Sequence, residues 1–122
     1  MAKTVAVDFD GVVHAYTLGW HDGTVYDEPV EGSIEALRTL QKDYAVVVFT
    51  TRNIIDAGRW LWEKGGFDIV VDPGPSLVFW NEQGSLLITN RKLPAVAYID
   101  DRGIRFVSWD QALGDLRRYE GK

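Results

Sequence analysis

Two acidic residues, Asp8 and Asp10, directly follow a short apolar run near the start of the chain. The run, residues 5–7, predicts a buried strand, and alternation along an extended backbone sends both carboxylates to the same side. Because an unpaired buried charge is costly, the end of this strand is expected to open onto a charged group. Two carboxylates there favour a hard cation such as Mg²⁺, and Gly11 allows a sharp turn just beyond them. The alternative is a strand that ends in a solvated Asx turn.

The same two acids could carry out chemistry at phosphorus. A carboxylate can act as a covalent nucleophile, forming an acyl phosphate that water then hydrolyses. Asp8 is placed for that role, and Asp10 could protonate the leaving oxygen and later deprotonate the water. Because phosphoryl transfer depends mostly on positioning and charge neutralisation, a metal, a cation and hydrogen-bond donors should complete such a site.

Polar residues also end two later apolar runs, residues 45–49 and 95–99. They are Thr50 and Thr51 after the first run, and Asp100 and Asp101 after the second. In parallel sheets, sites lie at the carboxyl ends of strands where the strand order reverses, so we expect these groups beside the first acid pair. Adjacent residues of a strand point to opposite sides. We therefore expect Asp101 to be a direct metal ligand, and Asp100 to orient it or to contribute through water.

The rest of the chain alternates predicted strands with predicted helices. Apolar spacing predicts a helix of about twelve residues from residue 34, and helices over 54–64 and 109–119. Asn53 and Asp56 resemble a capping pair for the second helix. Further strands are predicted over 67–71 and, at an edge, over 104–107. This order predicts one α/β domain, residues 1–122, with a three-layer, Rossmann-like, mainly parallel sheet, helices on both faces and right-handed crossovers.

Two segments interrupt this alternation. Residues 12–28 are rich in glycine and aromatic residues and predict a loop or a small two-stranded flap with a turn at Asp22-Gly23. Its Tyr16 and Trp20 would lie near the entrance of the site or cap the edge of the core. Two later runs, residues 76–80 and 85–89, are joined by residues 81–84 and predict a hairpin insert.

The composition limits the classes of protein to which the chain could belong. It has 122 residues, 46% of them apolar and 25% charged, which is typical of a soluble globular domain. The absence of cysteine excludes disulfides, thiolate metal sites and cysteine nucleophiles. A net charge of −5 argues against long nucleic acid as a partner. No run approaches the roughly 20 apolar residues that span a bilayer, and no signal peptide is expected, so a cytoplasmic protein without membrane contact is predicted. The oligomeric state stays open.

The ordered set of motifs resembles the haloacid dehalogenase superfamily. The motifs are Asp8-x-Asp10-Gly11-Val12, an apolar run ending in Thr50-Thr51-Arg52, then Lys92, and then Ile99-Asp100-Asp101. The resemblance covers most of the chain and is greatest to small members from phages and bacteria. The segments after the first two motifs are too short for a large cap domain, so a capless member is expected.

The resemblance implies a Mg²⁺-dependent phosphomonoester hydrolase. It implies that the backbone carbonyl of Asp10, rather than its carboxylate, contacts the metal, together with Asp8 and Asp101. It implies that Lys92 neutralises the phosphoryl oxygens and holds Asp8. Another phosphoryl oxygen would be bound by the Thr50 hydroxyl and by neighbouring groups at Thr51 and Gly11. The substrate would be a phosphorylated small molecule or an exposed phosphate on a larger one, including a nucleotide or a polynucleotide end, whose base the flap aromatics could stack.

Other interpretations compete with this one. A response-regulator phosphoacceptor would also use an acid pair, threonine and lysine, but here the acid pair and the acceptor would be in the wrong order. A non-catalytic interaction module on the same fold is the third possibility. Arg91 lies next to Lys92, and Arg52 and Arg102 are expected to be surface groups or to lie behind the site. His14 and His21 are expected to be surface histidines or substrate contacts, because their spacing does not indicate a metal site.

Overall fold

The computed structural model describes residues 2–100 and 108–120, the last two of these by backbone only. Three of the predictions, Asp101, Arg102 and the short strand over 104–107, lie outside this range. No helix in the described part of the chain is long and apolar enough to cross a membrane.

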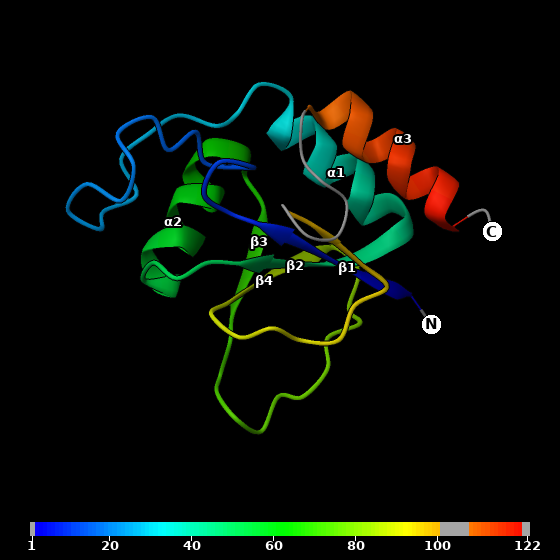
Figure 1. The fold of residues 1–122 in the computed structure, drawn as a ribbon. Coiled ribbons are helices and arrows are strands. Elements are labelled where there is room, and N and C mark those ends of the chain that lie inside the picture. Colours follow the sequence, from blue (N-terminus) through cyan, green and yellow to red (C-terminus); the bar gives the residue numbers. More distant parts are fainter. Residues whose placement is uncertain (1, 101–107, 121–122) are drawn as a thin grey trace.

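A parallel sheet forms the centre of the fold (Figure 1). Its strands are β1 (Lys3–Asp8), β2 (Tyr44–Phe49), β3 (Asp68–Val71), β4 (Ser85–Thr89) and β5 (Ala97–Ile99), in the spatial order β3-β4-β2-β1-β5. All four pairings between neighbouring strands are parallel. The inner strands are continuous apolar runs because both faces of the sheet are covered. The prediction of an α/β fold with a mainly parallel sheet is therefore confirmed.

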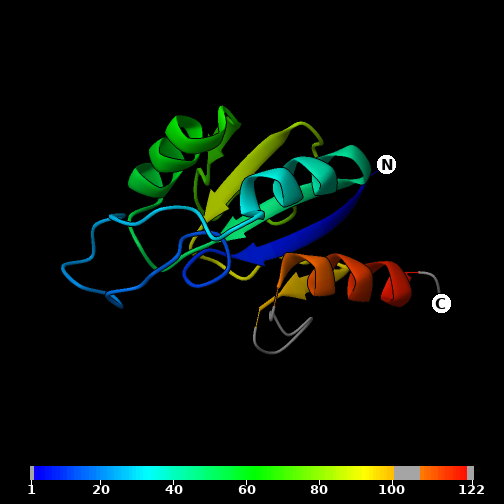
Figure 2. The same cartoon turned by 90° about the horizontal axis from the view of Figure 1, so that it is seen from above.

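The helices of the described chain all pack on one face of this sheet (Figure 2). They are α1 (Ser33–Asp43), α2 (Ile54–Gly65) and α3 (Trp109–Glu120). Leu37, Leu61 and Leu116, one from each helix, share a single core with Val5 and Val7 of β1.

The opposite face of the sheet is covered by irregular chain. There Ala6, Val47 and Leu87 pack against Trp80 and Leu93, which come from the segments before β4 and after it. The prediction of helices on both faces was therefore wrong for the described residues. These covering segments contain prolines, which interrupt helices, and they bury the sheet with single large side chains instead.

The second helix begins where the sequence predicted. The Asn53 side chain accepts hydrogen bonds from the backbone N–H groups of Ile55 (2.9 Å) and Asp56 (3.1 Å), as an N-cap does. Gly66 ends the helix with φ of 67°, a conformation that glycine adopts without a steric penalty. The cap also fixes the path of the connection from β2 to α2, and this connection contains Thr50 and Arg52.

The predicted hairpin insert was wrong. Residues 85–89 are β4, an inner strand that pairs in parallel with both β2 and β3. Leu86, Leu87 and Ile88 are fully buried, so this run belongs in the centre of a sheet rather than in an exposed hairpin. Residues 72–84 form an irregular connection without strand structure.

An ion pair between Asp72 and Arg91 holds that connection in place. Nε of Arg91 donates to one oxygen of Asp72 (2.8 Å) and Nη2 donates to the other (2.8 Å). Nη2 also donates to the carbonyl oxygens of Gly74 and Leu77, and the Thr89 hydroxyl donates to Asp72 (2.6 Å). The guanidinium and the hydroxyl hold the pKa of Asp72 well below its usual range.

We expect Asp72→Asn to lower the free energy of unfolding at pH 7 by about 1–3 kcal/mol, because Arg91 loses its charged partner. The pKa of Asp72 is lowered in the folded state, so its contribution is complete above the unfolded pKa of about 3.9 and declines as the pH falls toward the folded pKa. Urea unfolding at pH 7 and at pH 3 should therefore show a smaller difference from wild type at pH 3. Asp68→Asn, at an exposed aspartate of β3, is the control and should change stability by less than about 0.5 kcal/mol.

Candidate active site

The polar residues that follow β1, β2 and β5 lie at one edge of the sheet. Asp8 is paired in register with Phe49, and Val7 with Ile99, so Thr50 and Asp100 follow directly on the two sides of β1. β1 lies between β2 and β5, so the strand order reverses there, where ligand sites of open α/β sheets are found. Asp8, Thr50 and Asp100 therefore lie at one edge as expected, while Asp101 lies outside the described residues.

A pocket of about 320 Å³ opens at this edge. The described residues that line it are Asp8, Asp10, Tyr16, Phe49, Thr50 and Thr51. Lys92 lies beside it, with Nζ 4.1 Å from the centre of the Phe49 ring and 3.6 Å from Oδ2 of Asp100. Apart from Asp101, which is not described, the predicted acids, threonines and lysine thus surround one pocket and its rim.

Asp8 is a half-buried carboxylate at the end of β1. Its Oδ1 accepts a hydrogen bond from the backbone N–H of Phe9 (3.0 Å). Burial raises the pKa of Asp8 to about 6, against the opposing effects of the Phe9 N–H and the Lys92 charge, while Asp100 and Asp10 raise it further. At pH 7 this side chain is therefore mostly an ionised carboxylate, the form that a nucleophile or a metal ligand requires.

A tight turn follows Phe9 and depends on Gly11. The carbonyl oxygen of Phe9 accepts hydrogen bonds from the N–H groups of Val13 (2.8 Å) and His14 (2.9 Å). Gly11 has φ of 79°, in the left-handed region, and its N–H donates to the His14 carbonyl oxygen (2.7 Å). This bond occupies the Gly11 amide within the turn, so a contact between Gly11 and phosphate stays a prediction.

His14 is a fully buried residue, and its prediction as a surface or substrate-contacting histidine was wrong. Its ring stacks on Phe9 with a centroid distance of 5.2 Å and meets the edge of Trp60. Nε2 accepts a hydrogen bond from the backbone N–H of Asp27 (2.9 Å), and a backbone N–H can only donate. The ring proton is therefore on Nδ1, which donates to Oδ1 of Asp10 (2.9 Å). Tertiary packing against these aromatic rings accounts for its burial.

Arg52 is also fully buried, so the prediction of a surface group was wrong and a position behind the site is observed. Nε donates to both oxygens of Asp10, at 2.8 and 3.0 Å. Nη1 donates to the carbonyl oxygens of Trp20 (3.2 Å) and Thr24 (2.9 Å), and Nη2 to that of Gly19 (3.3 Å). The carboxylate of Asp10 is thus held by two buried side chains, Arg52 and His14. From the sequence, the only signal for the pairing of Arg52 with Asp10 is the general rule that a buried charge must be paired.

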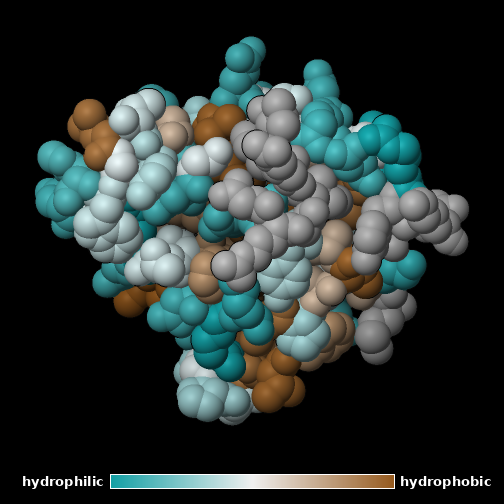
Figure 3. Space-filling view, in the orientation of Figure 1, coloured by the Kyte–Doolittle hydropathy of each residue, from teal (hydrophilic) through white to brown (hydrophobic). Residues whose placement is uncertain are grey.

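Residues 12–28, called the flap from here on, form a loop that extends beyond the end of β1 (Figure 1). Tyr16 lines the pocket, and its φ of 65° is a left-handed conformation that costs a non-glycine residue about 1–2 kcal/mol. Trp20 is 47% exposed and lies over Arg52, with the guanidinium carbon 4.5 Å from the ring centre. His21 is exposed, as predicted. In Figure 3 hydrophobic residues form small separate groups on the visible face rather than one continuous patch.

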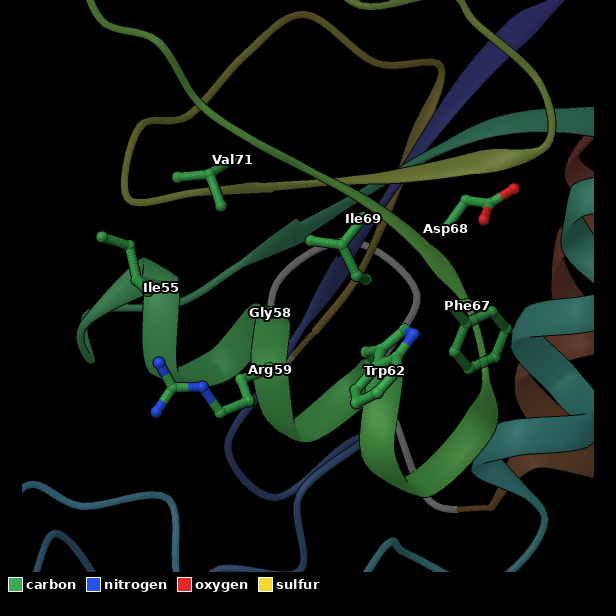
Figure 4. Close-up of a pocket in the computed structure, with 8 residues that line it drawn as sticks. All are labelled: Ile55, Gly58, Arg59, Trp62, Phe67, Asp68, Ile69 and Val71. Carbon is green, nitrogen blue, oxygen red and sulfur yellow. The ribbon is translucent and has the colours of Figure 1, made fainter.

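A second hollow, of about 270 Å³, lies between α2 and β3 (Figure 4). It is lined by Ile55, Gly58, Arg59, Trp62, Phe67, Asp68, Ile69 and Val71. Its lining is mainly apolar, and among the described residues it shares none with the pocket at Asp8. Because catalytic chemistry needs several convergent polar groups, the pocket at Asp8 is the candidate active site.

The described residues contain no group of three acidic or histidine side chains arranged to hold a metal ion. Asp101, the expected direct ligand, lies outside them. No protein-family model matches the chain, and no curated protein or solved structure matches it either.

We expect Trp20→Ala to lower the free energy of unfolding by about 1–2 kcal/mol, the size of a partly desolvated cation–π contact. Trp60→Ala is the matched comparison, because that ring is 6% exposed and its Nε1 donates to the Asp27 carbonyl oxygen (2.9 Å). It should cost about 3–5 kcal/mol, as truncation of a core aromatic residue does. Thermal unfolding of both variants measures this, and equal losses would place Trp20 in the core.

Proposed function

We propose that the protein is a Mg²⁺-dependent phosphomonoester hydrolase of the haloacid dehalogenase type that works through an aspartyl phosphate on Asp8. The observation that carries this proposal is the different environment of two acids only two residues apart. Asp8 faces the pocket, with the Lys92 charge acting on it, while Asp10 is held from behind by Arg52 and His14. Carboxylates in different environments can take different roles, and we assign Asp8 as the nucleophile from its position at the pocket rather than from its raised pKa.

In the first step, an oxygen of Asp8 attacks phosphorus and the bond from phosphorus to the leaving oxygen breaks. The proton for that oxygen passes through Asp10, which is a carboxylate paired with Arg52 at rest and takes the proton from the monoprotonated phosphate ester or from solvent, so the product alcohol leaves neutral. In the second step, water attacks the phosphorus of the acyl phosphate while Asp10 accepts a proton from it. The Asp8 carboxylate is restored and inorganic phosphate is released.

Thr50 supports the binding of a phosphoryl oxygen. Its buried hydroxyl oxygen accepts a hydrogen bond from the backbone N–H of Arg52 (3.0 Å), which leaves the hydroxyl hydrogen free to donate. The Thr50 N–H is already bonded to the Thr89 carbonyl oxygen (2.9 Å), so the side chain is the available donor. Lys92, about half exposed at the rim, and the exposed Thr51 complete the proposed phosphate-binding groups.

The donor chemistry of the pocket fits Mg²⁺, which prefers oxygen ligands. The Asp8 carboxylate would bind the ion. The family resemblance implies two further ligands, the Asp10 carbonyl oxygen and Asp101. The Asp10 carboxylate is already bound by Arg52 and His14, which supports a contact through its carbonyl rather than its side chain. When bound, the ion would neutralise charge on the phosphoryl oxygens.

The direct test is a panel of aryl, sugar and nucleoside monophosphates assayed with the wild type and with Asp8→Asn. We expect phosphate release by the wild type with Mg²⁺, its loss after chelation, and its recovery when Mg²⁺ is added back. Asp8→Asn should abolish turnover on every substrate, because an amide cannot form the acyl phosphate, while circular dichroism shows an unchanged fold.

Activity that persists in a chelated, extensively washed sample would contradict the role of the metal. Equal turnover by Asp8→Asn would contradict the nucleophile. A wild type that hydrolyses no member of the panel would instead favour the non-catalytic interpretation of this fold.

Asp10→Asn should keep the nucleophile and lose the acid–base step. We expect hydrolysis of an alkyl phosphate, whose leaving group is poor, to fall by about 10²–10⁴-fold, with a smaller loss for p-nitrophenyl phosphate, whose leaving group needs little protonation. The measurement is kcat/KM for the two esters. Near wild-type turnover of the alkyl ester would remove Asp10 from this role.

A further inference from the structure

We propose that Arg52 is a positioning residue that couples the conformation of the flap to the orientation of the Asp10 carboxylate. The coupling itself is independent of the reaction, whereas its catalytic consequence rests on the proposed function. The carbonyl oxygens that Arg52 binds belong to Gly19, Trp20 and Thr24, all in the flap, while its Nε binds Asp10 on the other side.

The geometry of the guanidinium makes this a directional link. Its N–H groups form a rigid planar fork, with Nε aimed at the carboxylate and both terminal nitrogens aimed at the flap. The side chain is fully buried, and so its charge must be paired within the protein. Loss of the flap carbonyl oxygens would leave those donors unsatisfied, and loss of Asp10 would leave the buried charge without its carboxylate.

His14 provides a second connection between the same two parts. Its Nδ1 donates to Asp10, and its Nε2 accepts from the N–H of Asp27 near the far end of the flap. Trp60 adds a bond from its indole N–H to the Asp27 carbonyl oxygen. The donors that fix the Asp10 carboxylate are therefore themselves fixed by the flap, at residues 19–24 and at residue 27.

The chain contains a matched control for Arg52. A Thr-x-Arg sequence lies at the carboxyl end of both β2 and β4, and in each the threonine hydroxyl oxygen accepts the arginine N–H at 3.0 Å. Each arginine pairs with one aspartate, Asp10 or Asp72, and with carbonyl oxygens of one loop. Arg91→Lys thus removes the same kind of interaction as Arg52→Lys, away from Asp10.

The first experiment measures hydrogen exchange of the backbone amides in Arg52→Lys, Asp10→Asn and Arg91→Lys. We expect exchange at residues 15–28 to rise about tenfold or more in Arg52→Lys, because a single ammonium nitrogen with three donors cannot reach the carboxylate and all three flap carbonyl oxygens at once. Asp10→Asn keeps the shape of the side chain, removes its charge and should also accelerate exchange in the flap. In Arg91→Lys the increase should be confined to residues 72–91.

Unchanged amide exchange of the flap in Asp10→Asn would overturn the coupling. An increase in flap exchange in Arg91→Lys as large as that in Arg52→Lys would overturn it as well. If Arg52→Lys does not fold, Asp10→Asn carries this test. The result does not depend on any enzymatic activity, so it decides the coupling even if the wild type hydrolyses no phosphate ester.

The second experiment measures kcat/KM of Arg52→Lys for esters with leaving groups that range from p-nitrophenol to a simple alcohol. A misplaced proton donor should matter only for poor leaving groups. We expect a loss within about threefold for the nitrophenyl ester and about 10²-fold or more for the alkyl ester. Arg91→Lys should affect both esters equally. A uniform loss in Arg52→Lys would assign it a purely structural role and overturn its effect on Asp10.

Discussion

The buried ion pair between Arg52 and Asp10 is the interaction on which the arrangement of the site depends. A guanidinium without solvent exposure needs a carboxylate and enough carbonyl oxygens to satisfy its N–H groups. Asp10 supplies the first and the flap supplies the second, so the pairing requirement fixes both together. The same ion pair gives the two acids of the first motif different surroundings. The Asp10 carboxylate is bound by Arg52, whereas Asp8 faces the pocket, where burial raises its pKa.

An arginine–aspartate pair of this kind occurs twice at this edge of the sheet. β2 and β4 are neighbours, and at the carboxyl end of each a threonine accepts the N–H of an arginine whose guanidinium binds an aspartate and a loop. One pair places the flap beside the pocket. The other holds the connection that covers the face of the sheet without helices. The Arg91–Asp72 pair is bidentate, which fixes orientation as well as distance, whereas Arg52 binds both oxygens of Asp10 through Nε alone and uses its terminal nitrogens for the flap.

The sequence predicted the features that depend on local pattern. Continuous apolar runs predicted β1 and β2, Asn53 predicted the start of α2, and the polar residues after three runs predicted the shared edge. What it did not predict depends on partners far along the chain. The run at residues 85–89 has the same local pattern whether it lies in a hairpin or between β2 and β3. Arg52 is a surface residue by type, and its burial depends on Asp10, 42 residues away, and on the flap carbonyl oxygens.

The balance of charge around Asp8 explains why a phosphatase site here would need a metal ion. Among the described residues, Asp8, Asp10 and Asp100 bring three negative charges to this edge, and Arg52 and Lys92 bring two positive ones. Arg52 is committed to Asp10, and Lys92 already lies near Asp100. A phosphate monoester carries further negative charge, so it would meet net repulsion from Asp8 in a partly desolvated pocket. A divalent cation held by Asp8, as we propose, would reverse the sign of that interaction, because a bound ion is often the largest local charge in such a site.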